Sequence, residues 1–525
     1  YHRWVGVVTV LTALVHCIFY YWTWIRQGEW IKEALPCFNC DVGEDGKDPW
    51  MNFLGLIALI AFLLIGATSI PWVRRRMYNT FYYVHHLFII GVIFAVLHWN
   101  NIILWILPTF TLYIISRSLS SSNGFTPVAV KEFTTLGDDI VKITLSRSTS
   151  QAGDYKVGQF VYLNIPSISK LEWHAFTIAS SPHSSSTSLT ILLKSLGDWT
   201  HEVAKYADAC KQDNVLPIVY MDAFYGASLE MYDEYSTVCL VGGGIGATPL
   251  FAILDDLVDK LSRGSAPVQK VHFIFTFREL TLLEELHPLL TRARELDPQQ
   301  QYFTFDFHLS QMPTNEQLDA LIDHERLAGR HHTVTTQYDT TASKSKPVPF
   351  AAPLQSTARK SSMYLAVFFA ICLSLTVIKY GQKIQASHPN LWPLQNFVEI
   401  TMVFVVVALV AFAFIIGERK FRPVSPPVTT PQTPTADCMY SSDVRSFREL
   451  VFEYNVKIGQ RPDMVEAMSR VLGGHTRFMS THPNHGNGVV GVFISGPTAL
   501  KISTEHAIAD LGPAHFDLHE EQFEL

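Results

Sequence analysis

The chain has 525 residues, of which only 17% are charged, and its mean hydropathy is slightly positive at +0.16. Soluble domains carry roughly 25% charged residues, so these values indicate membrane-spanning segments joined to soluble ones. The net charge of −7 offers no basic surface for nucleic acid, and the 7 cysteines are too few and too scattered for a disulfide scaffold. Because the chain begins with Tyr1 rather than methionine, we expect an incomplete N-terminus.

Membrane spans are the first predicted elements. A helix needs about 20 mostly apolar residues to cross a bilayer. Basic clusters at 74–76, 359–360 and 418–422 fall on one side if every span crosses, and the positive-inside rule makes that side cytosolic. The six stretches that qualify are Trp4–Ile25, Phe53–Val73, Tyr82–Trp99, Ile102–Leu119, Met363–Tyr380 and Phe397–Ile416.

The segment after the first span then lies outside. It carries Cys37 and Cys40. This pair is open to three interpretations: a small disulfide, transient metal binding, or free thiols.

The first span contains two histidines, His2 and His16. On an ideal helix, 14 residues rise about 21 Å and turn about 40° short of full turns. The two imidazoles therefore share a face, near opposite membrane surfaces. Ionisable side chains within a span are costly and usually functional.

The third span repeats the arrangement with His85, His86 and His98. The 13-residue step from His85 to His98 rotates about 140° out of register, and the step from His86 is little better. Spacing therefore does not choose between His85 and His86. The histidines are either interfacial side chains bonded to neighbours or axial ligands of two haems, one near each surface. Because two helices repeat the spacing, we favour haem.

Short β-rich runs begin beyond Asn123: "TPVAVKEF", "DIVKITLS", "GQFVYLNIP" and "SLTILLKSL". Their spacing predicts an antiparallel barrel. Next, "TVCLVGGGIGATPLFAILDDLVDKL" combines an apolar strand, a glycine turn and an apolar helix. Such a turn lets backbone N–H groups and a helix N-terminus approach a pyrophosphate, although the order "GGGIGATP" differs from the usual dinucleotide fingerprint.

Together these segments resemble the ferric reductase and NADPH oxidase superfamily of transmembrane flavocytochromes, closest in layout to ferric-chelate reductases. The resemblance implies a multi-domain membrane protein. It would contain an α-helical haem bundle, an antiparallel β-barrel FAD domain and an α/β NADPH-binding domain interrupted by a transmembrane hairpin. It further implies that His2 and His85 hold the inner haem b, and that His16 and His98 hold the outer one. His86 would then pack beside the site.

The resemblance also implies a flavin site from "HAFT" and "LKSLGDWT". A core position in the barrel is the alternative for a lone threonine or tryptophan. In the later "DAFYG" turn, Ala223 and Phe224 replace the family's glycine and proline. The implied FAD-binding residues are His174, Phe176, Thr177, Lys194, Gly197, Trp199 and Thr200.

The nicotinamide nucleotide is assigned to four segments by the same resemblance. Arg461 matches an arginine near the adenosine 2′-phosphate, and its planar donor fork favours NADPH over NADH. A surface arginine capping a helix is the alternative. The implied NADPH-binding residues are Gly242, Gly244, Gly246, Thr248, Pro249, Arg278, Arg461, Pro462, Gly496 and Pro497.

Three residues are implied to act at the reacting flavin. Thr177 would lie near its reactive edge. Ser495 stands where the family has a cysteine close to the hydride path, so transfer is expected to be slower. Phe523 matches the aromatic that covers the flavin ring, and the chain continues for two residues beyond it, as in plant-type ferric-chelate reductases.

The expected domains are the haem bundle at 1–120, the FAD barrel at 124–232 and the NADPH-binding domain at 235–312 and 445–525. An insertion at 313–444 separates the two nucleotide segments and holds helices at about 363–380 and 397–416. Its Thr/Ser/Pro-rich linkers bury too little apolar area to order themselves. We expect this hairpin to tether the domain to the membrane without chemistry of its own.

The function implied is a transmembrane NADPH-dependent metalloreductase. Electrons would pass from NADPH through FAD and two haems to a ferric, or also cupric, chelate outside. A superoxide-generating oxidase using dioxygen is the main alternative, and a haem-binding scaffold with lapsed flavin chemistry is another. Oxidases carry a histidine where Tyr20 stands and a long loop where only "WNN" follows His98, which favours the reductase. We expect a plasma membrane location rather than an organelle, with FAD and NADPH domains in the cytosol. The partners expected are the lipid bilayer and a small electron acceptor, without nucleic acid.

Overall fold

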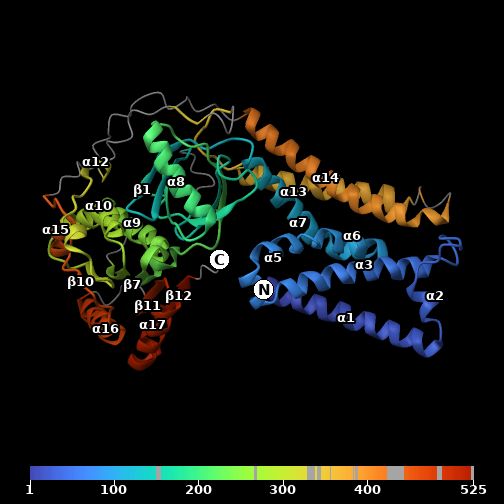
Figure 1. Cartoon of the computed structure of the whole chain (residues 1–525), viewed down its shortest axis with the longest axis horizontal. Helices are drawn as coiled ribbons and strands as arrows, with labels where there is room; N and C mark the ends of the chain where they lie inside the picture. Colours follow the sequence, from blue (N-terminus) through green and yellow to red (C-terminus); the bar gives the residue numbers. More distant parts are fainter. Residues whose placement is uncertain are drawn as a thin grey trace. The chain divides into compact units, whose positions relative to one another are not determined.

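The chain folds into two units, seen in a computed structural model. One unit comprises Tyr1–Ser121 and Pro353–Arg422, and the other Ser122–Ala352 and Pro423–Leu525 (Figure 1). The structure describes residues 1–148, 155–264, 269–327, 337–339, 345–354, 356–381, 384, 388–421, 443–481 and 487–521.

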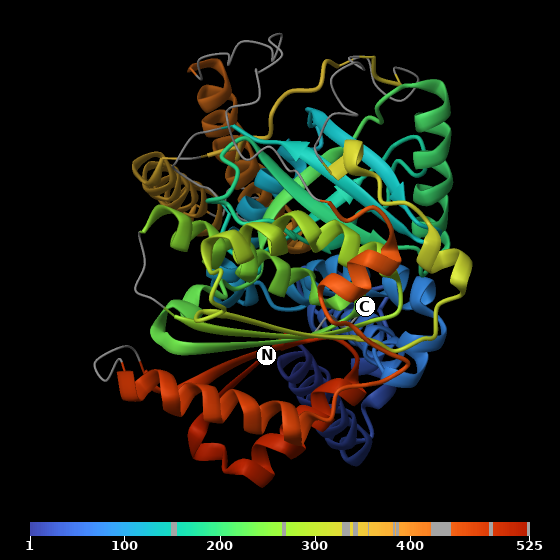
Figure 2. The ribbon, with the colours of Figure 1, turned by 90° about the vertical axis from the view of Figure 1, so that its left-hand side faces the viewer.

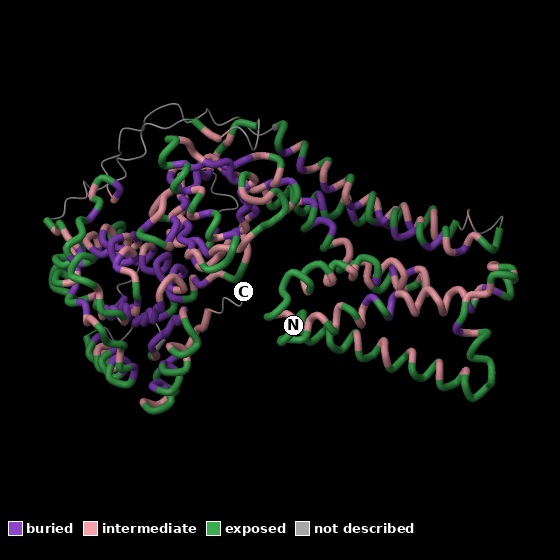
Figure 3. Tube along the Cα trace, in the orientation of Figure 1, coloured by how far each residue is buried: buried purple, intermediate pink, exposed green. Residues whose placement is uncertain are grey.

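The first unit is helical, and six of its described helices are long and apolar enough to cross a membrane. This confirms the number of predicted spans. Many of their large apolar residues are exposed, and long exposed stretches run along these helices in the trace coloured by burial (Figure 3), as expected of surfaces that face lipid. The elements are α1 (His2–Gln27), α2 (Trp30–Ala34), α3 (Lys47–Thr68), α4 (Pro71–Arg76), α5 (Tyr78–His85), α6 (Phe88–His98), α7 (Ile102–Asn123), α13 (Thr357–Leu375), η4 (Thr376–Tyr380), η5 (Pro389–Leu391) and α14 (Trp392–Phe421).

The second span ends earlier than predicted. Helix α3 stops at Thr68, and Ile70 has extended backbone angles before α4 begins at Pro71. A residue that precedes proline is disfavoured in the helical region, which explains the break. The predicted span to Val73 was therefore wrong at its C-terminal end.

The third span is interrupted between α5 and α6. The backbone N–H of His86 donates to the Tyr83 carbonyl, and that of Leu87 donates to the Val84 carbonyl. These i→i−3 bonds make a tighter turn than an α-helix. The out-of-register step between His85 and His98, calculated for a continuous helix, therefore does not apply.

The inserted hairpin of α13 and α14 packs within the helical unit. Val96 of α6 and Ile103 of α7 share a buried cluster with Met363 of α13 and Val403 of α14. Arg359 at the start of α13 pairs with Glu418 near the end of α14. The hairpin is thus part of the bundle rather than only a tether.

The flavin-type region of the second unit consists of two three-stranded antiparallel sheets, in the orders β1-β2-β5 and β4-β3-β6. Side chains from both sheets, such as Val141 and Val161, form one core with α8. This arrangement agrees with the predicted antiparallel domain. The elements are β1 (Val130–Leu136), β2 (Ile140–Ser146), β3 (Phe160–Asn164), β4 (His174–Thr177), β5 (Ser188–Lys194), α8 (Asp198–Asp213) and β6 (Tyr220–Tyr225).

The nucleotide-type region is a parallel six-stranded sheet in the order β10-β9-β8-β7-β11-β12. Apolar side chains of α9 and α10 cover one face, and those of α16 and α17 cover the other (Figure 2). Strands β9 and β10 are neighbours although the insertion separates them in sequence, which confirms an interrupted α/β domain. The elements are η1 (Glu230–Glu234), β7 (Tyr235–Gly243), η2 (Gly244–Ala247), α9 (Thr248–Arg263), β8 (Lys270–Phe277), α10 (Leu280–Leu296), β9 (Phe303–Leu309), α11 (Asn315–Asp319), α12 (His324–Leu327), α15 (Phe447–Glu453), β10 (Lys457–Ile458), α16 (Met464–Thr481), β11 (Asn487–Ser495), α17 (Thr498–Leu511), η6 (Pro513–His515) and β12 (Phe516–Glu521).

Candidate functional site

Two pairs of imidazole rings face each other between α1 and the broken third span. The ring centroids of His2 and His85 are 5.9 Å apart, and those of His16 and His98 are 6.4 Å apart. Imidazoles on opposite sides of one metal ion lie roughly 6.3 Å apart between centroids, if metal–nitrogen bonds are about 2.0–2.1 Å as at zinc. Both centroid distances, 5.9 and 6.4 Å, are close to this separation.

The neighbouring contacts distinguish the histidines. His85 faces His2, whereas His86 is exposed and bonds through Nδ1 to the Tyr82 carbonyl at 2.8 Å. The Nδ1 atom of His98 lies 2.8 Å from the Met51 carbonyl. Histidine ligands of metals usually donate their second N–H in this way.

Haem fits these residues better than a bare metal ion does. The described residues contain no group of three or more His, Cys, Asp and Glu side chains that could hold a metal ion. Haem needs only two axial ligands from the protein, because its own nitrogens supply the others.

The cysteine pair lies in the segment between α1 and α3. Cys37 and Cys40 form a disulfide. The Trp50 indole N–H donates to the Cys37 carbonyl at 2.9 Å, which links this segment to α3.

The two flavin motifs meet at Trp199. Its ring stacks on His174 with centroids 4.2 Å apart and on Phe176 at 5.9 Å. Trp199 is buried in the core that the two antiparallel sheets share, so the core interpretation describes its packing well. The Nε1 atom of Trp199 is buried and lacks a hydrogen bond within the described chain, whereas the Nε2 atom of His174 lies 3.7 Å from a carboxylate oxygen of Glu172. Burial lowers the pKa of His174, although Glu172 opposes this effect.

The start of α8 carries Trp199 and follows a short connection from β5. The hydroxyl of Thr200 accepts from the backbone N–H of Leu196 and of Gly197, both at 2.9 Å. A Cβ added at Gly197 would meet nothing within 4 Å, so the backbone is open to an approaching phosphate. Thr177, by contrast, is buried at the end of β4 opposite Phe160.

Lys194 is engaged by acidic side chains. Its ammonium pairs with Glu279 and lies 3.1 Å from Asp139. Burial disfavours the charged ammonium, but these carboxylates outweigh it and raise the pKa of Lys194. Lys194 therefore links β5 to the residue before α10, and its predicted pyrophosphate contact would require an exchange of partners.

The bulky "DAFYG" residues are accommodated by packing. Phe224 lies against Tyr155 and Phe350, with centroids 5.3 and 5.5 Å apart. The Tyr225 hydroxyl donates to Asp222 at 2.8 Å. Phe224 thus packs against the core that the two antiparallel sheets share.

The glycine turns meet where the strand order of the parallel sheet reverses. Strands β7 and β11 are neighbours, and one turn follows each of them. In open α/β sheets, ligands bind beyond the carboxyl ends of the strands at this switch point. A Cβ added at Gly246 would lie 3.1 Å from the Cα of Gly496. Gly244 has φ +55° and no neighbour within 4 Å of an added Cβ. Thr248 and Pro249 begin α9 directly behind the turn.

Ser495 links the two turns. It is fully buried at the end of β11, and its hydroxyl donates to the Gly246 carbonyl. Gly496 and Pro497 follow it directly in the chain. Phe523, the third residue assigned to flavin chemistry, lies outside the described residues.

The two predicted NADPH-binding arginines lie at the same edge of the sheet. Arg278 follows β8, and Arg461 and Pro462 follow β10. Both arginines are exposed and make no hydrogen bond or ion pair with any described residue. Parallel strands end at one edge, so both guanidinium groups are available to a nucleotide bound there.

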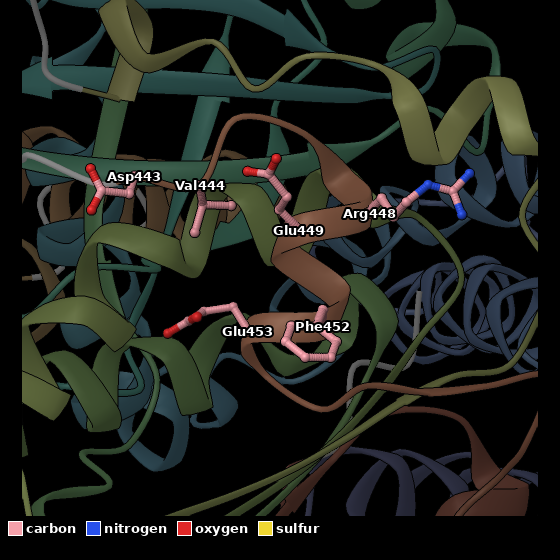
Figure 4. Close-up of a pocket in the computed structure, with 6 residues that line it drawn as sticks. All are labelled: Asp443, Val444, Arg448, Glu449, Phe452 and Glu453. Carbon is pink, nitrogen blue, oxygen red and sulfur yellow. The ribbon is translucent and has the colours of Figure 1, made fainter.

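A surface depression elsewhere does not coincide with these sites. It lies along α15 and includes none of the site residues described above (Figure 4). Its lining residues are Asp443, Val444, Arg448, Glu449, Phe452 and Glu453.

Sequence reasoning missed four contributors. Gly55 and Met51 of α3 contact His98, and Glu279 and Asp139 hold Lys194. For Gly55 and Met51, the only signal in the sequence was a glycine within an apolar span. For Glu279 and Asp139 there was no local signal, because both lie far from Lys194 in the chain.

Comparisons with known families cover most of the chain. The family described as "Ferric reductase like transmembrane component" matches residues 1–96, and "FAD-binding domain" matches 125–229. "Ferric reductase NAD binding domain" matches 235–509, which is more than half of the chain.

Curated relatives agree with these matches. "Probable ferric reduction oxidase 1" of Arabidopsis thaliana is 25% identical over 425 residues, covering 80% of this chain and 58% of that protein. "Ferric reduction oxidase 8, mitochondrial" of the same plant is 30% identical, and the match covers 54% of this chain and 38% of that protein. "Dual oxidase 2" of Homo sapiens is 27% identical and covers 57% and 20%. The chain thus spans at most 58% of the length of these relatives.

Similarity to solved structures is weak. The cytochrome P450 reductase GcoB of Amycolatopsis has a TM-score of 0.28 and 19% identity, covering 36% of this chain and 53% of that one. This score supports no conclusion. The family matches and the six apolar helices together identify a multi-pass membrane protein with FAD- and NAD(P)H-binding domains. The chain belongs to the ferric reductase and NADPH oxidase superfamily.

Proposed function

We propose that the protein is a transmembrane NADPH-dependent ferric-chelate reductase. When bound, FAD accepts a hydride from NADPH and releases single electrons, which two b-type haems carry across the bilayer. One observation carries this proposal. Two pairs of imidazole rings, with centroids 5.9 and 6.4 Å apart, lie in a helical bundle that is joined to flavin and nucleotide domains.

The protein's own residues bind and orient in this scheme. His2 with His85, and His16 with His98, would hold the inner and outer haem. The start of α8 and the rings around Trp199 would receive FAD. The turns at 242–246 and 496–497 would receive the nucleotide diphosphate, and Arg461 with Arg278 would select the 2′-phosphate.

The surroundings of His98 favour a metal chelate as the acceptor. Helix α6 ends at His98 and α7 begins at Ile102, so the connection is too short to cover the outer haem. Tyr20 packs on His16 with centroids 4.7 Å apart, where an oxidase has a second histidine. Two of the relatives reported are named ferric reduction oxidases.

Dioxygen remains the second candidate acceptor, because Dual oxidase 2 is also a relative. The test is NADPH-driven reduction of a ferric chelate and superoxide output, measured in the same membranes. We expect chelate reduction to dominate and to persist with superoxide dismutase. Chelate reduction that the dismutase abolishes would instead identify an oxidase. Bound-flavin absorbance in purified protein separates both enzymes from a haem scaffold.

The proposal includes the arrangement in the membrane. The FAD and NADPH domains, with the boundaries predicted above, would lie in the cytosol, and the disulfide segment outside. Plasma membrane is the proposed location. Protease digestion of intact cells, which should spare the nucleotide domain, tests the orientation.

A further inference from the structure

We propose that helix α3 contains a built contact site for the His98 imidazole, consisting of Gly55 and the Met51 carbonyl. This inference rests on the proposed ligation of the outer haem by His98. It assigns a positioning role to two residues that touch the ligand rather than the iron.

Gly55 provides space that no other residue would leave. A Cβ added there would lie 2.7 Å from Nδ1 of His98 and 3.0 Å from both Cε1 and Cγ. Real Cβ atoms do not approach a ring this closely, so the imidazole would have to move. Gly66 on the same helix differs, because its added Cβ would lie 3.4 Å from a methyl group of Val10, an ordinary contact.

The same glycine uncovers the hydrogen-bond acceptor. A helical side chain lies over the turn that precedes its own Cα, so a side chain at position 55 would cover the carbonyl of Met51. Without one, His98 Nδ1 reaches that carbonyl at 2.8 Å. Gly55 and Met51 therefore act together, one by its lack of a side chain and the other by its backbone oxygen.

The bond fixes the tautomer of His98. With the proton on Nδ1, the lone pair of Nε2 is free for a metal, and the ligand becomes more basic. His85 differs, because its Nδ1 is buried without a hydrogen-bond partner in the described chain. The two haem sites are therefore unequal, and a more basic ligand favours the ferric form of the outer haem.

Helix α14 also contacts the end of α6. Asn396 of α14 is buried and donates to the Leu97 carbonyl at 3.4 Å. The residue next to the proposed ligand is thus contacted by the inserted hairpin while His98 itself contacts α3. Both contacts restrict rotation of the last turn of α6.

The first test compares Gly55→Ala with the matched control Gly66→Ala. Haem is counted by pyridine haemochrome, and each haem is titrated by spectroelectrochemistry. Loss of an outer-shell partner typically costs 10–100-fold in affinity, so Gly55→Ala should lose the outer haem or raise its midpoint potential. The inner haem and the Gly66→Ala variant should match the wild type. Two haems with unchanged potentials in Gly55→Ala would overturn the proposal.

A second test does not depend on the folding of Gly55→Ala. In His98→Gly, added imidazole should restore the outer haem roughly 10-fold or more better than 1-methylimidazole, which lacks the N–H that Met51 accepts. In His85→Gly the two ligands should act alike. Equal rescue at position 98 would overturn the contact site. Wild-type protein without two haems would instead overturn the proposed function, so the two failures are distinguishable.

Discussion

Replacement of Arg461 by alanine should raise the KM for NADPH far more than the KM for NADH. Arg461 is exposed at the carboxyl edge of the sheet and makes no ion pair with a described residue. Its removal therefore breaks no contact seen in the folded protein, and the free energy of unfolding should change by no more than about 0.5 kcal/mol.

The expected size follows from the contact with the 2′-phosphate. A hydrogen bond to a charged group contributes roughly 1.5–3 kcal/mol, and each 1.4 kcal/mol is a factor of ten. The ratio of the KM for NADPH to the KM for NADH should thus rise roughly 10- to 150-fold. Steady-state kinetics with both nucleotides on the same preparation measures this ratio.

Arg470→Ala is the matched control. Arg470 lies on α16 and pairs with Asp306 and Glu466, so its loss should affect both nucleotides equally. If Arg461→Ala raised the KM values for NADPH and NADH by the same factor, a contact of Arg461 with the 2′-phosphate would be excluded. Arg461 would then be a structural arginine, the alternative left open by the sequence.

Three further predictions concern the haems, the switch point and acid stability. Leucine at His16 or His98 should remove the outer haem and leave the inner one, and a pyridine haemochrome count of two haems in either variant would contradict the ligand assignment. Gly496→Ala should weaken nucleotide binding and lower the free energy of unfolding by about 1–3 kcal/mol. The reason is that Gly496 has φ +153° and an added Cβ would lie 2.9 Å from the Gly243 backbone. Equilibrium dialysis measures the first effect and thermal melting the second. Burial, with nearby basic groups, lowers the pKa of His272 from 6.5 to about 3. As the pH falls, His272 is therefore protonated in the unfolded chain but not in the folded one. The free energy of unfolding of the nucleotide domain should decrease by about 2 kcal/mol between pH 7 and pH 5. His272→Phe should flatten that dependence in thermal melts, whereas an unchanged slope would exclude His272 as its source.

Patterns of local sequence predicted the elements that a single segment determines. The six spans follow from hydropathy, and the strand, glycine turn and helix at 235–263 follow from their order. Neighbouring strands β9 and β10 were predictable as one domain because both segments resembled the same family. The regular periods of helices and strands carry this information.

Contacts between distant segments were not predictable in the same way. The turn at His86 and Leu87 brings His85 and His98 toward α1, although ideal helix geometry placed them out of register. Ser495 is fully buried against the glycine turn, and a sequence match cannot show that its hydroxyl is already bonded. Lys194 likewise pairs with Glu279, 85 positions further along the chain.

The inserted hairpin gives the same lesson. Its two apolar stretches predicted spans, but not that Val403 and Met363 would pack with α6 and α7. Hydropathy reports that a helix is apolar, and tertiary packing alone decides which neighbour it meets.

Electron transfer across a sealed membrane is the defining property of the proposed reductase, and it can be measured in vesicles. Purified protein with its haems and FAD is reconstituted in liposomes that enclose a membrane-impermeant ferric chelate and a ferrous indicator, and NADPH is added only outside. Ferrous iron should form inside the vesicles with the wild-type protein and should not form with the His98→Leu variant. Ferrous iron that appears only after the vesicles are made leaky, with protein oriented to receive external NADPH, would contradict electron transfer across the membrane.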